Sequence, residues 1–170
     1  MIRLFAPLIL FILFISESIF VLLAGEWFYK SYIFSPKFIF IALLFLAFYG
    51  PKKYFFGFSI FFGLLTDIVY SEVIGIYLLA FPALCYVVHF IKSVVQNNYF
   101  IALFISLVGI SLLEFFSFLV NTVIRITSMP IDEFLFVRLI PTLIFNFVFL
   151  LVAMVPLRKM AEKIKLSVDK

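Results

Sequence analysis

The chain has 170 residues, of which 66% are apolar and 13% are charged, with a formal net charge of +4. A typical soluble domain is about half apolar and about a quarter charged, so this composition excludes an ordinary soluble fold, which would expose too much aggregation-prone surface. Continuous apolar runs favour helices over an alternating β-barrel, so we predict an all-α integral membrane protein whose basic residues mark topology rather than nucleic-acid binding.

The first apolar run covers about residues 4–24, which is long enough for one membrane crossing of about 20 residues. A secretory signal peptide has a shorter apolar region, and Glu17 interrupts this one, so we expect a retained first helix. The aromatic segment 26–30 then predicts an interfacial belt.

A second run, about residues 33–49, has Pro36 and Lys37 near its start and a Gly-Pro loop after its end. The third and fourth runs cover about residues 54–70 and 73–90, and only a short polar break separates them. We therefore expect these two runs to form a tight helical hairpin.

The fifth run, about residues 99–126, is long enough to predict a tilted or protruding helix. Its polar residues Glu114, Asn121 and Arg125 are spaced seven and then four apart, so they should share one helix face. The sixth run covers about residues 134–157, and a basic tail follows it.

Six crossings would place both termini on the same side of the membrane. That side would carry nine basic residues, and the other side would carry four: Lys30, Lys37, Arg125 and Arg138. Because basic residues accumulate on the cytoplasmic side, we predict that both termini are cytoplasmic. We expect one integral membrane domain over residues 1–170, without a soluble domain.

Three carboxylates interrupt the apolar runs. At about 1.5 Å per residue, Glu17, Asp67 and Glu114 lie roughly 20 Å from the inner ends of their helices, in the outer half of the membrane. An isolated acid there costs at least about 2.5–3.5 kcal/mol, so each should face the bundle interior, pair with an arginine or line a water-filled cleft. Arg125 and Arg138 lie in the same layer and are the available counter-ions.

Two hypotheses compete for this polar layer. In the first, the layer is a satisfied structural network that fixes how otherwise featureless helices pack. In the second, it is a site for a ligand, an ion or a partner helix.

The sequence offers no catalytic machinery. The single histidine, His89, lies at the opposite end of the helices from the acids, and an intramembrane aspartate opposite Asp67 is lacking. The single cysteine, Cys85, permits neither an intrachain disulfide nor a cysteine-rich metal site. We therefore expect a protein that is not an enzyme and has no metal or cofactor.

The stretch Gly63-Leu64-Leu65-Thr66-Asp67-Ile68, followed by Gly75 eight residues after the aspartate, resembles the MreD family of rod shape-determining membrane proteins. The chain length, the number of apolar runs and the basic tail agree with this family. The residues that match the family pattern are Gly63, Asp67 and Gly75.

The resemblance implies a non-catalytic subunit of the cell-wall elongation machinery in the bacterial plasma membrane, acting in peptidoglycan synthesis. Its implied partners are MreC and, through MreC, the polymerase RodA, a class B penicillin-binding protein and MreB filaments. The family is also considered similar in fold to the S components of energy-coupling-factor transporters. We hypothesise that the transmembrane helix of MreC packs on this bundle, with the polar stripe of the fifth run as one candidate surface.

Two other functions compete with the scaffold. An S component would bind a vitamin or similar solute in an outward-facing cavity, but the first helix lacks the paired small residues used to dock on the transport subunit. An ion-coupled carrier would use Asp67 and Glu114, but such carriers have repeats and broken helices, which the sequence does not predict.

Overall fold

A computed structural model describes residues 2–28, 32–71, 73–96 and 98–168, and describes side chains from residue 6 onward except at 24–28. The side chains of the predicted aromatic belt at 26–30 and of Glu72 therefore lie outside the described residues. The helices are α1 (Ile2–Phe28), α2 (Phe38–Tyr49), α3 (Lys52–Tyr70), α4 (Ile76–Ile91), α5 (Tyr99–Val123), α6 (Ile131–Glu133), the π-helical η1 (Phe134–Leu139) and α7 (Ile140–Val168).

The short helix α2 forms the centre of the molecule. Every one of its residues is buried, and α1, α3, α4, α5 and α7 all pack against it. A helix that is apolar all round is either a buried core helix or a lipid-facing span, and here the surrounding helices make α2 the core helix. The surrounding helices bury one face each and expose large apolar side chains on the other, as expected in lipid.

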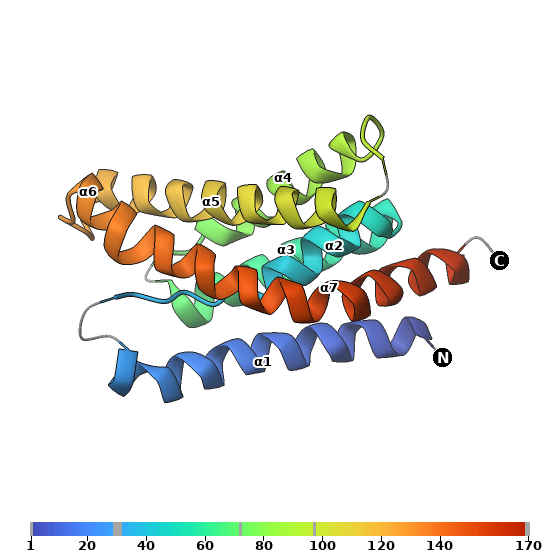
Figure 1. Cartoon of the computed structure of the whole chain (residues 1–170), viewed down its shortest axis with the longest axis horizontal. Coiled ribbons are helices and arrows are strands. Elements are labelled where there is room, and N and C mark those ends of the chain that lie inside the picture. Colours follow the sequence, from blue (N-terminus) through green and yellow to red (C-terminus); the bar gives the residue numbers. More distant parts are fainter. Residues whose placement is uncertain (1, 29–31, 72, 97, 169–170) are drawn as a thin grey trace.

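Both termini lie at the same end of the molecule, together with the α2–α3 and α4–α5 connections (Figure 1). By length and composition, α1, α3, α5 and the continuous α6–η1–α7 unit can each cross a membrane, and α2 and α4 are shorter apolar helices. The prediction of an all-helical membrane protein is therefore confirmed. Six crossings and a cytoplasmic location of the termini remain predictions.

The second helix begins later than predicted, at Phe38 rather than near residue 33. Pro36 explains the difference, because a proline has no backbone N–H and keeps the residue before it out of the helical region. Residues 33–37 are therefore not helical, although they lie against the bundle interior.

The polar groups of segment 33–37 are bonded by the last helix. Non-helical backbone at membrane depth is tolerated only where protein satisfies it. Two side chains one turn apart, Thr142 and Asn146, form most of the hydrogen bonds to this segment. The bonds are Ile33 N–H to the Val137 carbonyl (2.8 Å), Ser35 N–H to Thr142 Oγ1 (3.1 Å), Lys37 N–H to Asn146 Oδ1 (2.9 Å) and Asn146 Nδ2 to the Ser35 carbonyl (2.9 Å).

Other boundaries shift by a few residues. The fourth helix starts at Ile76 rather than at 73, because Gly75 has a φ of 122° and interrupts the chain before it. The last helix runs to Val168, well past the predicted end at 157. Its basic extension is amphipathic: Met160, Ala161 and Ile164 are buried, and an ion pair of 2.7 Å joins Arg158 to Glu162 one turn later.

Candidate functional site

Asp67 lies at the end of α3 and binds the beginning of α4. Its carboxylate accepts hydrogen bonds from the backbone N–H groups of Gly75 (2.9 Å), Tyr77 (2.8 Å) and Leu78 (2.9 Å). The first N–H groups of a helix have no partner inside it, and its N-terminus carries a partial positive charge. In the described chain no basic side chain pairs with Asp67. Of the options expected for a buried acid, Asp67 faces the bundle interior, where backbone N–H groups bind it.

Gly63 lies one turn before Asp67 and sets the distance between α3 and α4. A Cβ atom on Gly63 would lie 2.6 Å from the Tyr77 carbonyl oxygen and 3.0 Å from the Leu78 Cα. Only glycine allows the two backbones to approach this closely. Gly63, Asp67 and Gly75 thus act together: the first permits the approach, the second binds the N-terminus of α4, and the third makes the turn.

Glu17 performs a similar role for α2. Its Oε2 atom accepts a hydrogen bond of 3.3 Å from the backbone N–H of Ile39, in the first turn of that helix. Glu17 is buried, and the N-cap residue of α2, Lys37, gives no side-chain cap of its own. Nearby, the Ser18 and Tyr70 hydroxyls share a hydrogen bond that joins α1 to α3. The two short helices α2 and α4 therefore each receive a carboxylate from the helix before them.

Glu114 is held differently, by two cations. Arg138 donates from Nε to Glu114 Oε2 at 2.9 Å, and Lys37 Nζ lies 3.1 Å from Oε1. The Glu114 side chain is fully buried, the Lys37 side chain is 7% exposed and the Arg138 side chain is 31% exposed. Lys37 also lies 3.5 Å from the Tyr77 hydroxyl. The cluster of one acid and two cations carries one net positive charge, which the carboxylate of Glu17 can offset.

Two small polar cavities adjoin this ion cluster, in the half of the bundle away from the termini. One, of about 190 Å³, lies beside Glu17, Lys37 and segment 33–36; the other, of about 240 Å³, lies between α5 and the α5–α6 connection. Tyr70, Tyr77 and Arg138 line both cavities. At about 30 Å³ of liquid volume per water, each cavity has room for a few waters or a small polar solute.

The site has no catalytic or metal-binding set among the described residues. No group of three or more histidine, cysteine or acidic side chains could hold a metal ion in this part of the chain. His89 lies elsewhere, where its Nδ1 is 3.0 Å from the Ala47 carbonyl and its ring packs 4.9 Å from that of Phe55. The polar layer can hold helix ends, an ion cluster and small polar molecules.

Comparison with known proteins identifies the family. The family model described as rod shape-determining protein MreD matches residues 1–164. The chain belongs to the MreD family. It is similar to the rod shape-determining protein MreD of Bacillus subtilis (strain 168), with 28% identity over 157 residues that cover 92% of this chain and 91% of that protein. No solved structure matches the chain.

The MreD family consists of bacterial membrane proteins that determine rod shape, which confirms the predicted family, membrane location and general role. The similarity to transporter S components remains a prediction.

In this MreD-family chain, the predicted polar stripe of the fifth helix is shorter than expected. The helix α5 ends at Val123, and Arg125 follows it with a φ of 60° and an exposed side chain. Arg125 therefore does not share a face with Glu114, and in the described chain it forms no ion pair. Asn121 bonds within its own helix, to the Ser117 carbonyl at 2.9 Å, and lines the larger polar cavity.

Sequence reasoning missed Lys37, Thr142 and Asn146. Lys37 looked like an interfacial lysine at the start of a helix, yet it is a central member of the ion cluster. A signal for the other two was available: Thr142 and Asn146 are four residues apart in an apolar helix, which places both on one face.

Proposed function

We propose that this MreD-family protein is a non-catalytic scaffold subunit of the cell-wall elongation machinery that binds MreC within the membrane. Through MreC it would be linked to RodA, a class B penicillin-binding protein and MreB filaments. The observation that carries the proposal is the family match over residues 1–164, combined with described helices that leave only short connections between them. Such a protein contacts partners mainly through its lipid-facing helices.

The polar layer supports a non-catalytic role. Each of its three buried acids already holds a structural partner: Glu17 a helix end, Asp67 another helix end, and Glu114 two cations. Groups that act in acid–base chemistry need a reacting partner within reach, and here the protein itself occupies those positions.

The polar stripe of α5 is poorly placed to bind the MreC helix, because Glu114 and Ser117 are buried inside the bundle. The outer groove between α4 and α5 is better suited. It includes an apolar cavity of about 530 Å³ near the inner end and a second of about 330 Å³ farther out, and Leu84 and Leu112 line both.

This α4–α5 groove has the length and lining that a transmembrane helix needs. It extends along α5 from Phe100 to Phe116, which is about 24 Å at about 1.5 Å per residue. Small residues, Ala80, Ala83 and Gly109, line its floor. Small residues let transmembrane helices approach closely, so we place the MreC helix in this groove.

Site-specific photo-cross-linking tests this placement. A photoreactive residue at the exposed position Ala83 should cross-link to MreC in membranes, whereas one at Ile19, which is 50% exposed on α1, should not. Equal cross-linking from both positions, or cross-links only from loop positions, would count against the groove. Absence of MreC from the purified complex would instead count against the scaffold itself.

The second candidate function is a small-solute binding subunit similar to an S component. The two polar cavities beside Arg138 favour it, since a solute site needs enclosed polar space. A ligand that binds only the folded state raises thermal stability by an amount that grows with its concentration. For a scaffold, a panel of vitamins should leave the melting temperature of the purified protein unchanged, and a dose-dependent rise with one compound would favour the solute-binding function.

A further inference from the structure

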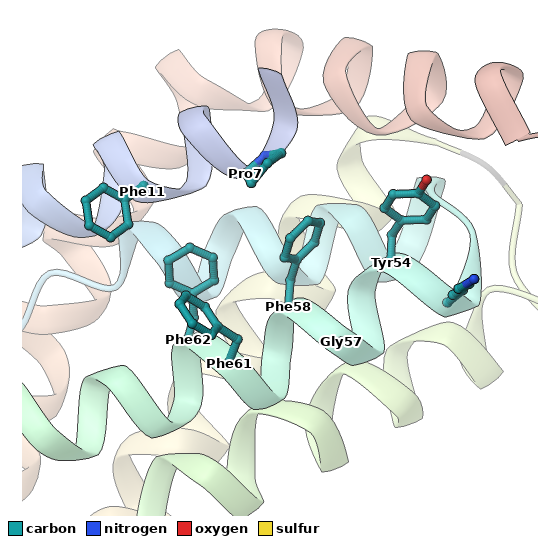
Figure 2. Close-up of a pocket in the computed structure, with 8 residues that line it drawn as sticks. Pro7, Phe11, Tyr54, Gly57, Phe58, Phe61 and Phe62 are labelled. Atoms are coloured by element: carbon teal, nitrogen blue, oxygen red, sulfur yellow. The ribbon is translucent and has the colours of Figure 1, made fainter. Parts of the chain in front are cut away.

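A second apolar groove lies between α1 and α3 (Figure 2). It has a volume of about 710 Å³, within the range of about 300–1,000 Å³ that is usual for ligand sites. Its wall on α1 consists of Pro7 and Phe11. Its wall on α3 consists of Lys53, Tyr54, Gly57, Phe58, Phe61 and Phe62.

The groove is closed at its outer end. The Phe14 ring of α1 packs 6.1 Å from the ring of Phe62 and 5.6 Å from that of Tyr70, and the Ser18–Tyr70 hydrogen bond joins the same two helices. Nearer the termini the groove is open at Gly57, where a Cβ atom would meet no atom within 4 Å. The space is therefore a wedge that is closed by side chains at its outer end and open around Gly57.

The depth of this wedge matches one leaflet. From Lys53 to Phe62 the helix rises about 14 Å at about 1.5 Å per residue. Half of a hydrocarbon core of about 30 Å is about 15 Å. A transmembrane helix packs along a longer surface, such as the α4–α5 groove of about 24 Å, so a half-depth wedge that is closed at one end fits a lipid chain better than a helix.

The open end of the wedge is polar. Lys53 and Tyr54 lie in the first turn of α3, whereas the lining farther along is aromatic or glycine. In the described part of the chain Lys53 has no acidic partner within ion-pair distance. A lysine ammonium above an apolar groove complements an amphiphile with a negative headgroup and a hydrocarbon tail.

We propose that the α1–α3 groove binds one anionic phospholipid of the inner leaflet, with its phosphate at Lys53 and Tyr54 and an acyl chain along Phe58, Phe61 and Phe11. The charge of Lys53 selects the headgroup, and the closure at Phe14 and Phe62 limits the depth of the chain. This site is separate from the α4–α5 groove, so it does not depend on the binding of MreC.

Native mass spectrometry of the delipidated full-length protein tests the proposal, with phosphatidylglycerol and phosphatidylcholine of the same acyl chains as probes. The wild type should retain phosphatidylglycerol in preference to phosphatidylcholine. One lysine near an anionic headgroup accounts for about a fivefold change in affinity, so Lys53→Gln should weaken phosphatidylglycerol binding by about fivefold. Lys159→Gln, which removes an exposed charge from α7, should change it little.

A second variant pair tests the groove itself. A Cβ atom at position 57 would meet no atom within 4 Å, so Gly57→Leu should project into the groove and abolish retention of phosphatidylglycerol at unchanged melting temperature. Ala83→Leu, a matched enlargement in the α4–α5 groove, should leave lipid retention intact. Equal retention of the two lipids by the wild type, or undiminished retention by Gly57→Leu, would overturn the proposal. A transmembrane protein segment captured by a photoreactive residue at position 57 would overturn it as well.

Discussion

At the scale of single residues, the three buried acids find polar partners inside the bundle in two ways. Asp67 and Glu17 accept backbone N–H groups at the starts of α4 and α2, and Glu114 pairs with Arg138 and Lys37. The sequence predicts that each acid must be satisfied, because an unpaired charge in hydrocarbon is costly. It does not reveal a backbone partner, since every residue except proline carries an N–H group.

Substitutions at Asp67 should distinguish the contribution of its hydrogen bonds to stability from the contribution of its shape. Asp67→Leu leaves three N–H groups of the α4 start without their acceptor, and each buried unsatisfied group costs about 1–3 kcal/mol. Asp67→Asn keeps one acceptor oxygen and should lose less. In thermal unfolding in detergent, the wild type should therefore be the most stable, Asp67→Asn less stable and Asp67→Leu the least stable. The control Asp132→Leu, at an exposed position, should leave stability nearly unchanged. Equal stability of Asp67→Leu and the wild type would contradict the capping role.

The ion cluster around Glu114 should behave as one unit. Removing one partner from a buried ion pair costs about 3–5 kcal/mol, whereas replacing all partners by apolar residues can be nearly neutral. We therefore expect Glu114→Leu to be much less destabilising in a Lys37→Met, Arg138→Met background than in the wild type. A double-mutant cycle by thermal or denaturant unfolding measures this coupling, and simple additivity would show that the three side chains act independently.

At the scale of elements, the two short helices define the fold. The 12 residues of α2 span about 18 Å, too short for a hydrocarbon core of about 30 Å. The non-helical segment 33–37 lies directly before α2, and we predict that segment and helix together complete one crossing. The unwound half requires Thr142 and Asn146 to satisfy its backbone, which explains two polar residues in an otherwise apolar α7.

Gly63 and Gly57 provide a matched test of the α3–α4 contact. Alanine in the interior of a helix is favoured over glycine by about 1 kcal/mol when nothing opposes it. At Gly57 nothing lies within 4 Å, so Gly57→Ala should maintain or raise the melting temperature. At Gly63 the new Cβ would meet backbone atoms at 2.6 Å and 3.0 Å, so Gly63→Ala should lower it clearly. The same response at both positions would mean that close approach of the backbones does not matter.

Much of this element arrangement could be predicted from the sequence. Long apolar runs predict the helices, and the polar break after Tyr70 predicts the α3–α4 hairpin, because both signals depend only on neighbouring residues in the sequence. Pro36 indicates that the segment before Phe38 is not helical. The burial of this segment, however, depends on hydrogen-bond partners more than a hundred residues away in the sequence. For the same reason the sequence does not reveal that Glu114, on a distant helix, holds Lys37 inside the bundle.

At the scale of the whole molecule, function divides between the interior and the lipid-facing surface. A fully buried α2, and helix starts bonded by Glu17 and Asp67, make the interior a fixed framework. The exterior carries two apolar grooves: one between α4 and α5 that extends over about 24 Å of α5, and one between α1 and α3 that extends over about 14 Å of α3. We propose that a partner helix occupies the first groove and a lipid the second, and the linings of the two grooves share no residue.

Shape rescue in living cells tests the scaffold account most directly. Cells of the native rod-shaped host, depleted of this protein, should regain their length-to-width ratio when they express the wild type or Ile19→Trp. They should remain round with Ala83→Trp, although that variant is inserted in the membrane at wild-type level, because the added ring fills the α4–α5 groove. Failure of the wild type to restore rods, or full rescue by Ala83→Trp with MreC still bound, would contradict the account.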